Sequence, residues 1–502
     1  MSATFPVTFV LRNGQAVEAA SCPPVGLEDF RRAILAEVKA GARIASFFAR
    51  PRGTGLQLMC ILARDERGDL AVVSAGAASE FPSLLPDCPQ AHWFEREIRE
   101  QWGLTPAGHP WLKPIRFQPP RGAAAPPPPE IGVADFFRMD GPEVHEVAVG
   151  PVHAGVIEPG HFRFQCLGET VYHLEVSLGY QHRGVERALA AGLGPRTIHY
   201  IETLAGDTTI GHADAFCRAV ESLKAIHAPP RAQAIRGIAS ELERLANHVG
   251  DLGALAGDVG FLPAHNYCGR IRGDVLNLTA AVCGNRFGRG LLLPGGVRFD
   301  IEPALAERML AALFGIERDT RSAVELMFDS PSVLARFEGT GPLLAGTAEQ
   351  IGLVGPAARA CGLDRDVRFR HPYGIYRFAS LSVSTWHTGD CLARAQVRRL
   401  EIRRSVEFVR DQLRSLPAGP IAVAEPGELP PGRIVTTLVE GWRGEICHTL
   451  ATDDRGRLSF YKVVDPSFHN WFGLAMALRD QQISDFPLCN KSFNLSYCGH
   501  DL

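Results

Sequence analysis

A proline-rich stretch most limits how this chain can fold, because it separates two parts that must each build a core. Six of the eleven residues in Pro119–Pro129 are proline. Proline fixes φ and has no backbone N–H, so the stretch extends neither a helix nor a central strand and acts as a semi-rigid spacer. We predict a first domain over 1–118, a linker over 119–146 and a second domain over 147–502. A length of 502 residues suits two or three domains.

The composition is that of an ordinary globular protein and excludes several functional classes. Hydrophobic residues make up 46% and charged residues 21% of the chain, and the net charge is -3. A nucleic-acid-binding surface would show a basic excess, and a disordered chain would lack this much apolar material. No apolar run reaches the ~20 residues of a membrane-spanning helix, and the N-terminus lacks the pattern of a signal peptide. We expect a cytoplasmic protein that meets a membrane only through other subunits.

Twelve cysteines are scattered along the chain, and no two form a C-x-x-C pair. The closest two are Cys489 and Cys498. Single cysteines in a cytosolic protein are mostly small buried hydrophobes. The spacing therefore argues against a self-contained zinc, iron–sulfur or C-x-x-C redox site.

Residues 1–118 carry the patterns of an α+β domain. Leu27–Ala40 places apolar side chains at helical spacing. Strand-like runs surround it, at Pro6–Leu11, Arg43–Ala49, Leu56–Leu62 and Leu70–Ser74. Three motifs near the end of this part resemble the small hydrophilic subunit of respiratory complex I: Glu95-Arg96-Glu97, Trp102-Gly103 and Gly108-His109-Pro110. Two interpretations of them remain open, an amphipathic helix with a solvated Arg/Glu face or the interaction surface that the resemblance implies.

The second part begins with strand-like sequence and continues as helices. Gly150–Gln165 is punctuated by Gly and Pro and then alternates, which predicts a β-hairpin, and Val171–Leu178 continues the alternation. A helix is expected from Gly179. From about 212 to 330 the pattern is helical, with a stripe of apolar residues on one face: Ile235, Ile238, Leu242, Leu245, Val249 and Leu252. The polar faces of that helix carry Glu241, Glu243, Arg244 and His248.

Several motifs in this part resemble one superfamily. The string G-x-x-H-R-G-x-E, here Gly179–Glu186, is shared by the large subunit of NiFe hydrogenases and the quinone-pocket subunit of complex I. Leu293–Arg298, Val439–Glu445 and the tail Asn490–Leu502 resemble the same proteins in the same order. In several membrane-bound hydrogenases of the formate-hydrogenlyase type, both modules are joined in one polypeptide. The resemblance implies an α+β domain, a Pro-rich linker and a mainly α-helical domain with a β-rich start.

The resemblance raises the question of a nickel site. A NiFe hydrogenase holds its metal with four thiolates, because soft sulfur ligands hold nickel through its changes of oxidation state. The matching positions here carry no sulfur: Ala205, Thr208, Ser496 and Gly499. Cys217 and Cys498 lie near them in sequence, but two unpaired thiols cannot complete a four-sulfur site. We predict that no metal is bound and that the chain does not turn over hydrogen itself.

In complex I the metal-free cavity receives a quinone headgroup, which takes electrons from an iron–sulfur cluster in an adjacent small subunit. Reducing a quinone takes two protons as well as two electrons, so proton donors are needed beside it. The resemblance implies His153 and Glu158 as donors, with Asp207 on the segment that replaces the first nickel cysteines. Plainer roles remain open for them: a turn histidine, a solvated turn carboxylate and, as for His212, a structural hydrogen bond.

Further positions are carried over from the family as contacts to cofactors. Thr208 or Thr209 falls near the position of a quinone-binding tyrosine in complex I, and Tyr497 or Tyr200 would supply the missing phenol. His182 and Arg183 lie, in the family, toward the iron–sulfur cluster of the partner, where a cation favours the reduced and more negative cluster. Their plainer interpretation is an ordinary helix start.

Three functions follow from these patterns. The first is a nickel-free, hydrogenase-like subunit of a membrane-associated oxidoreductase, which passes electrons from a partner iron–sulfur subunit to an acceptor such as quinone, with coupled proton movement. The second is a non-catalytic scaffold whose cavity is filled by side chains. The third is an active NiFe hydrogenase, which the missing thiolates contradict.

The expected partners are an iron–sulfur small subunit and membrane antiporter-like subunits at the inner face of the cell membrane, and no nucleic acid. No Gly-rich dinucleotide fingerprint follows a strand, so a link to NAD rests on the resemblance alone.

Overall fold

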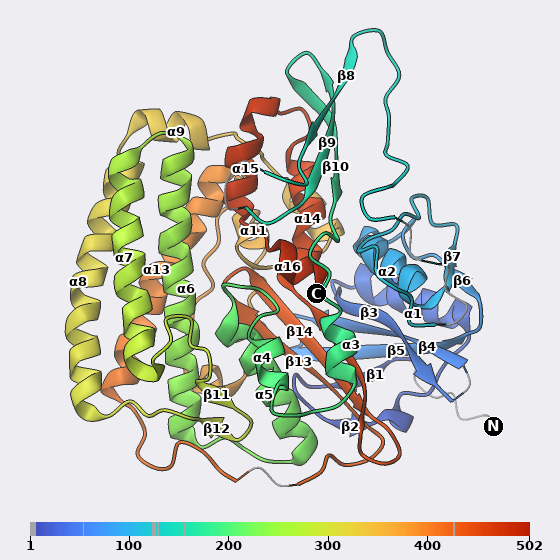
Figure 1. Ribbon diagram of the computed structural model, residues 1–502, viewed down its shortest axis with the longest axis horizontal. Helices are drawn as coiled ribbons and strands as arrows, with labels where there is room; N and C mark the ends of the chain where they lie inside the picture. Colours follow the sequence, from blue (N-terminus) through green and yellow to red (C-terminus); the bar gives the residue numbers. More distant parts are fainter. Residues whose placement is uncertain (1–6, 54, 123–126, 128–129, 154–156, 425–426) are drawn as a thin grey trace.

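The computed structural model describes residues 7–53, 55–122, 127, 130–153, 157–424 and 427–502. Its N-terminal part is an antiparallel sheet with helices packed against it, which confirms the predicted α+β domain (Figure 1). The strands pair in the order β1-β5-β4-β3: β1 (Phe9–Leu11), β3 (Arg43–Arg52), β4 (Gly55–Arg64) and β5 (Asp69–Ala77). Helix α1 (Leu27–Lys39) buries Phe30 and Ile34 against this sheet, as its spacing predicts.

Helix α2 (His92–Trp102) carries the Glu95-Arg96-Glu97 motif, and the interpretation of a solvated Arg/Glu face is wrong. Glu95 and Glu97 are buried. Glu97 pairs at 2.6 Å with the ammonium of Lys462, which lies in the second part of the chain and also meets Glu186 at 3.0 Å. The motif is therefore an interaction surface, and the surface that it contacts belongs to the same chain.

The two parts of the chain are also interleaved in a second sheet. Strand β2 (Val17–Glu18) pairs with β13 (Arg433–Gly441), which gives the order β15-β14-β13-β2. The remaining strands of this sheet are β14 (Gly444–Thr452) and β15 (Leu458–Val464). The side chain of Asn13 donates to the carbonyl of Leu438 at 2.9 Å and accepts from its amide at 2.8 Å. Residues that precede the predicted linker therefore complete a sheet of the second part.

A three-stranded sheet projects from one edge of the molecule (Figure 1). Its order is β10-β9-β8: β8 (Val144–Val149), β9 (His161–Leu167) and β10 (Thr170–Ser177). The predicted Gly150–Gln165 segment connects β8 to its antiparallel neighbour β9 and forms most of β9. The tight turn of this sheet lies between β9 and β10 at Gly168, whose φ of 56° suits it. The boundary set at 146 lies inside β8, and the helix expected from Gly179 begins only at α3 (Val185–Ala190).

Long helices form the layer beside the second sheet (Figure 1), as predicted for 212–330. They are α5 (Thr209–Lys224), α6 (Pro230–Asp258), α7 (Leu262–Cys283), α8 (Pro303–Phe328) and α13 (Cys391–Arg414). Shorter helices are α4 (Thr197–Ile201), α9 (Pro331–Phe337), α10 (Ala345–Gln350), α11 (Gly355–Ala360), α12 (Val367–Arg370), α14 (Pro466–Ala477), α15 (Phe486–Phe493) and α16 (Tyr497–Asp501). Two short strand pairs, β6–β7 (Glu80–Pro82, Thr105–Ala107) and β11–β12 (Leu292–Leu293, Gly296–Val297), complete the strands. Within the described residues, no helix combines the length and the apolar character needed to span a membrane.

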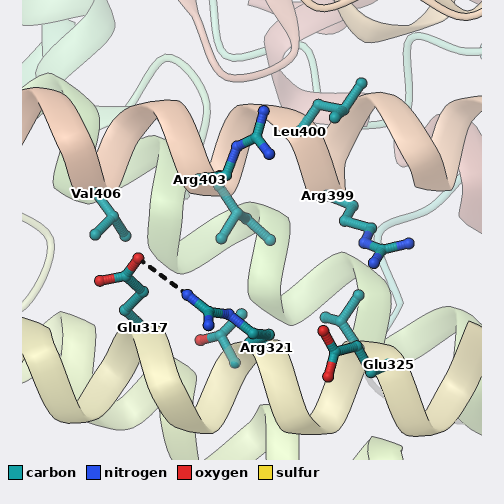
Figure 2. A pocket seen from close by; sticks show the side chains of 10 residues that line it. Glu317, Arg321, Glu325, Arg399, Leu400, Arg403 and Val406 are labelled. Atoms are coloured by element: carbon teal, nitrogen blue, oxygen red, sulfur yellow. Dashed lines mark hydrogen bonds and ion pairs between the residues drawn. The ribbon is translucent and has the colours of Figure 1, made fainter.

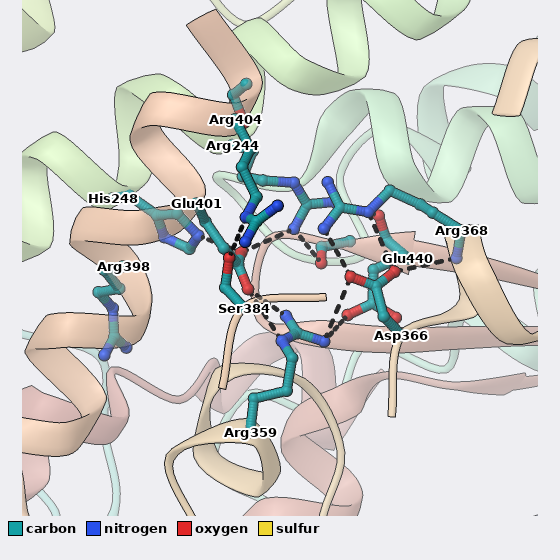
Figure 3. Close-up of polar contacts among 12 residues, drawn as sticks. Arg244, His248, Arg359, Asp366, Arg368, Ser384, Arg398, Glu401, Arg404 and Glu440 are labelled. Carbon is teal, nitrogen blue, oxygen red and sulfur yellow. Dashed lines mark hydrogen bonds and ion pairs between the residues drawn. The ribbon is translucent and has the colours of Figure 1, made fainter. Parts of the chain in front are cut away.

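The charged residues of α6 are buried, although helical spacing places them on polar faces. Glu241 and His248 are 0% exposed and Arg244 is 1% exposed. Figure 3 shows Arg244 and His248 in a network with residues of α12, α13 and β13. Arg368 reaches Glu241 at 2.9 Å, and His248 meets Glu401 at 2.8 Å. We call this set the α6 charge network: Glu241, Arg244, His248, Arg359, Asp366, Arg368, Glu401 and Glu440.

A surface cavity of about 250 Å³ lies between α8 and α13 (Figure 2). Of its charged lining residues, Glu317 pairs with Arg321 at 3.5 Å, and it also pairs with Arg410 outside the cavity. Arg399 and Arg403 of α13 extend along its other wall (Figure 2). None of its lining residues belongs to the C-terminal tail, so this cavity is separate from the site that the sequence predicts.

Candidate functional site

The tail that the sequence analysis singled out is folded into the interior. After α15 the chain turns at Asn494 and forms α16, whose residues are all buried, and Leu502 is 1% exposed. The main-chain oxygen of Leu502 accepts from the amides of Arg183 and Gly184, at 3.0 and 3.1 Å. The Asp501 carboxylate accepts from two further amides, those of Gly179 and Gln181. The tail is thus held by the backbone of the G-x-x-H-R-G-x-E segment.

The two segments that replace the nickel cysteines lie side by side. One guanidinium nitrogen of Arg183 donates to the carbonyl of Leu204 at 3.0 Å and to that of Cys498 at 3.5 Å. The amide of Gly206 donates to the thiol of Cys498. The structure therefore brings together the turn before α5 and the start of α16, as the family alignment predicts.

The residues at the four metal positions do not fit a four-thiolate nickel site. Ala205 and Gly499 offer no ligand atom. The hydroxyl of Ser496 caps α16 by accepting from the Gly499 amide at 2.9 Å. A Cβ built on Gly499 would lie 2.7 Å from Cγ of Asp465, so a cysteine at this position would collide with that carboxylate. Across the described residues, no group of three or more His, Cys, Asp or Glu side chains is placed to hold a metal ion.

Glu158 and His153 both lie in the loop between β8 and β9, beside the tail. The carboxylate of Glu158 accepts from the amides of Tyr497 and Cys498, each at the long distance of 3.4 Å. The ring of His153 folds back on its own loop, and its Nε2 donates to the carbonyl of Gly160 at 3.1 Å. Of the two, only Glu158 contacts the tail directly.

Two phenols were considered for the site, and the structure separates them. Tyr497 is 7% exposed and its ring packs edge-on against Trp471, with 4.8 Å between centroids. Burial raises its pKa, against a hydrogen bond with Asn490 that lowers it. Tyr200 is 42% exposed on α4. Tyr497 is thus the phenol beside Glu158, while Tyr200 faces outward.

Asp207 and Thr208 are held by an arginine that sequence reasoning did not select. Arg443 donates to both carboxylate oxygens of Asp207, at 2.5 and 2.8 Å, and to the hydroxyl of Thr208 at 3.4 Å. Burial alone would lower the pKa of Arg443, but the Asp207 carboxylate outweighs it and holds that pKa above its ordinary value. The indole of Trp442 donates to the carbonyl of Asp207 at 3.1 Å. The signal was present, since Arg443 stands in the Val439–Glu445 motif, which forms the β13–β14 turn.

His212 belongs to a buried chain of hydrogen bonds that ends at Asp465, beside Gly499 of the tail. Its Nε2 meets Asp465 and its Nδ1 meets Nε2 of His448, both at 3.1 Å; Nδ1 of His448 meets the hydroxyl of Tyr461 at 2.9 Å. These contacts are consistent if Tyr461 donates to His448, His448 donates to His212 and His212 donates to Asp465. Burial raises the pKa of Asp465, but the bond from His212 and the charge of Arg443 outweigh it and keep the pKa low. A carboxylate therefore stands where a cysteine at position 499 would need space.

His182 and Arg183 bind the tail backbone. Nδ1 of His182 donates to the carbonyl of Asp501 at 2.8 Å, and Arg183 donates to the carbonyl of Thr203 at 2.7 Å. Burial lowers the pKa of His182, against that bond, which raises it. Both residues precede α3, so the interpretation of an ordinary helix start does not describe them.

This geometry defines a class of protein: a hydrogenase-type large subunit whose nickel positions lack sulfur, fused to a second module. Comparisons with known proteins agree. Residues 258–435 match the family described as "Respiratory-chain NADH dehydrogenase, 49 Kd subunit", and residues 41–125 match its "30 Kd subunit". Among similar proteins, formate hydrogenlyase subunit 5 of Escherichia coli (strain K12) is 30% identical over 436 residues, which cover 83% of this chain and 76% of that protein.

Two further relatives are not named as hydrogenases. A subunit of the F(420)H(2) dehydrogenase of Methanosarcina mazei is 33% identical over 64% of this chain and 84% of its own length. NADH-quinone oxidoreductase subunit 4 of Thermus thermophilus is 30% identical over 68% of this chain and 90% of its own length. The chain belongs to this family of oxidoreductase subunits, and it joins the 30-kDa and 49-kDa modules in one polypeptide.

Proposed function

We propose that this chain is a nickel-free subunit of a membrane-associated oxidoreductase complex that passes electrons from a partner iron–sulfur cluster to quinone beside the tail. The observation that carries the proposal is the chemistry at the metal positions. The hydroxyl of Ser496 caps α16, and Gly499 faces the Asp465 carboxylate. Two relatives named for dehydrogenase or quinone chemistry support an activity without hydrogen turnover.

Quinone reduction needs proton donors, and the side chains around the tail offer several. Glu158 is half-buried, and its carboxylate accepts two long bonds from main-chain amides, so it can change partner at small cost. His153 and Tyr497 lie on either side of Gly160, close to Glu158. Glu158 and His153 would supply protons, Tyr497 and Thr208 would contact the headgroup, and Asp207 would lie beside it in its ion pair with Arg443.

The expected partners follow from this assignment. The exposed part of Arg183 would face the iron–sulfur small subunit, where its charge favours the reduced cluster. Antiporter-like membrane subunits would couple proton movement and hold the chain at the inner face of the cell membrane. These assignments extend to this chain what the relatives suggest as parts of multisubunit enzymes.

The test uses the purified complex and has two measurements. Elemental analysis should find iron from the partner subunit but no stoichiometric nickel. A quinone-analogue titration should show saturable binding, which His153→Ala or Glu158→Gln weakens at least about tenfold, the effect of roughly 1.4 kcal/mol. The matched control is His145→Ala, an exposed histidine on β8, which should leave binding unchanged. One nickel per chain, or titration curves that superpose for His153→Ala and the unaltered complex, would refute the proposal.

A non-catalytic coupling subunit is the second candidate, and one observation favours it. The tail residues fill their own surroundings: Ser496 is 1% and Tyr497 7% exposed. If the chain is such a scaffold, the analogue will not bind, and Glu158→Gln will leave turnover of the complex intact.

A further inference from the structure

Two cysteines from different helices share one arginine, away from the site described above. Cys391 is the first residue of α13, and Cys489 lies in α15. Nη2 of Arg394 lies 3.5 Å from Sγ of Cys391 and 3.9 Å from Sγ of Cys489. Because both sulfurs contact the same guanidinium nitrogen, they lie near each other. Both cysteines are fully buried.

Arg394 differs from the other fully buried arginines in its counter-charge. Arg116, Arg236, Arg244 and Arg359 each pair with a glutamate. Among the described residues, Arg394 pairs with no carboxylate; its other bonds go to a serine hydroxyl and two carbonyls, those of Ser492, Gly389 and Gly341. A buried guanidinium stays charged and needs an anion. The ionisable groups around it are thiols, so the sulfur of Cys391 supplies the negative charge.

The nearest carboxylates are already engaged. Asp390 caps α13 by accepting from the amide of Ala393 at 2.8 Å, and it also accepts from the Gly339 amide. Asp485 pairs with Arg336 at 3.2 Å. Neither carboxylate forms an ion pair with Arg394, and among the described residues the ionisable side chains that bond to Arg394 are Cys391 and Cys489.

The two thiols are therefore unequal. Burial raises the pKa of Cys391, but the hydrogen bond from Cys489 and the charge of Arg394 outweigh it and lower the pKa to about 6. Burial raises the pKa of Cys489 well above its ordinary value. A thiolate beside a thiol is the arrangement from which disulfides form.

We propose that Cys391 and Cys489 are a redox-responsive pair that closes to a disulfide on reaction with a hydroperoxide. The Cys391 thiolate attacks one peroxide oxygen and the O–O bond breaks, which gives a sulfenic acid and releases hydroxide or alkoxide. The Cys489 sulfur then attacks the sulfenic sulfur; the S–S bond forms, and the hydroxyl leaves as water with the thiol proton. Two electrons pass from the two sulfurs to the peroxide.

The chain contains a matched pair that lacks the cation. Cys60 and Cys88 are neighbours in the first domain, and both are buried. Burial raises the pKa of each, that of Cys88 to about 11, and no arginine is among the groups that oppose it. If burial or proximity alone decided reactivity, both pairs would behave alike.

Formation of the disulfide would also affect the tail. This effect on activity rests on the proposed function, whereas formation of the disulfide does not. Helix α15 leads directly into Asn494, whose carbonyl accepts from Arg443 at 2.5 Å. A bond between Cys489 and the start of α13 would therefore tie the entry of the tail to the helical layer. We expect a lower rate of electron transfer to quinone in the oxidised complex.

The experiment treats the intact complex with hydrogen peroxide, alkylates the remaining thiols after denaturation and maps the peptides by mass spectrometry. The expected product is a Cys391–Cys489 disulfide that dithiothreitol reverses. It should form at least about tenfold faster than any oxidation of Cys60 or Cys88, because thiolate reacts and thiol does not. Full alkylation of both cysteines, or equal rates for the two pairs, would overturn the proposal.

Two variants keep the test decisive. Cys489→Ser removes the resolving thiol and should stop the reaction at a sulfenic acid on Cys391, which a dimedone probe traps. Arg394→Met should slow oxidation about tenfold; if it fails to fold, the Cys489→Ser result stands alone, and an untrapped Cys391 there contradicts the mechanism. Activity is measured in parallel: loss of quinone reduction without a disulfide refutes the pair, and a disulfide in a complex that never reduces quinone refutes only the proposed function.

Discussion

The α6 charge network and the C-terminal tail both bury charged side chains, but they neutralise them by different means. In the network, carboxylates meet guanidinium groups: Arg359 reaches Glu401 and Glu440, both at 2.7 Å (Figure 3). In the tail, the partners are mostly main-chain groups, as for Glu158 on two amides and Arg183 on three carbonyls. Ion pairs of the first kind lock helices together, because each charge depends on the other.

The two regions differ in how easily their carboxylates can change partner. The hydrogen bonds from amides to Glu158 are long, at 3.4 Å, so little interaction energy is lost when this carboxylate changes partner. A carboxylate that pairs with two buried arginines loses far more interaction energy when it changes partner. We therefore assign the network to stability and the tail to function, and three experiments can break this division.

The largest effect is expected for Arg359→Met in the network. The substitution leaves Glu401 and Glu440 buried without that cation, so the free energy of unfolding should fall by roughly 3–5 kcal/mol. Denaturant unfolding of the purified chain measures it. Arg318→Met removes a surface pair with Asp319 and should cost less than about 1 kcal/mol. Equal losses in both variants would show that the network is not a stabilising element.

The second experiment uses pH to loosen the tail. Burial lowers the pKa of His500 to about 4, although Asp501 opposes it. The unfolded chain takes up this proton near pH 6.5, so the contribution of His500 to stability is complete above pH 6.5 and is lost as pH falls toward 4. The loss reaches roughly 3 kcal/mol. In the network, burial raises the pKa of Asp366 but Arg368 and Arg359 outweigh it and lower it to about 2, so that carboxylate stays ionised. Burial also raises the pKa of Glu440 to about 7 and lowers that of His248, so the network responds to acid as well and is not the reference for this measurement.

Hydrogen exchange at pH 7 and pH 5 measures the difference by region. Amides of α16 should exchange faster at pH 5 after correction for intrinsic rates, while those of α8, which contains no histidine, should not change. In His500→Gln the dependence of α16 on pH should flatten. Uniform changes along the chain would mean that the two regions do not differ in acid sensitivity.

The smallest effect is expected for Gly499→Ala. The added Cβ would lie 2.7 Å from Asp465, and relieving this overlap should cost roughly 1–3 kcal/mol. Gly269→Ala in α7 has nothing within 4 Å and should instead stabilise by up to about 1 kcal/mol. A Gly499→Ala chain as stable as its parent would mean that the space at position 499 is open, and the steric case against a thiol there would fail.

Patterns that depend on one element were predictable from the sequence. The helix at Leu27 and the strands of the first sheet appear where the periodicity places them, because one face of each is buried. The family motifs also placed the tail beside the turn before α5. They could not show that Arg443 reaches Asp207, since that contact joins residues far apart in the chain.

Burial of charge was the main failure of the sequence analysis. Spacing shows that Glu241 and Arg244 lie off the apolar stripe of α6, but it cannot distinguish a solvated face from one that meets Arg368 and Glu401 on other elements. The same holds for the Glu95-Arg96-Glu97 motif, whose partner Lys462 is hundreds of residues away. Partners of buried charges come from tertiary structure, which one sequence does not reveal.

Because β2 pairs with β13, the first part of the chain supplies backbone to a sheet of the second part. A cut within the proline-rich stretch would therefore leave two fragments that these hydrogen bonds still hold together. If the second part were made without the first, the edge of β13 that pairs with β2 would be uncovered and could pair with another chain. In the fused chain, every second part is made together with the strand that covers this edge.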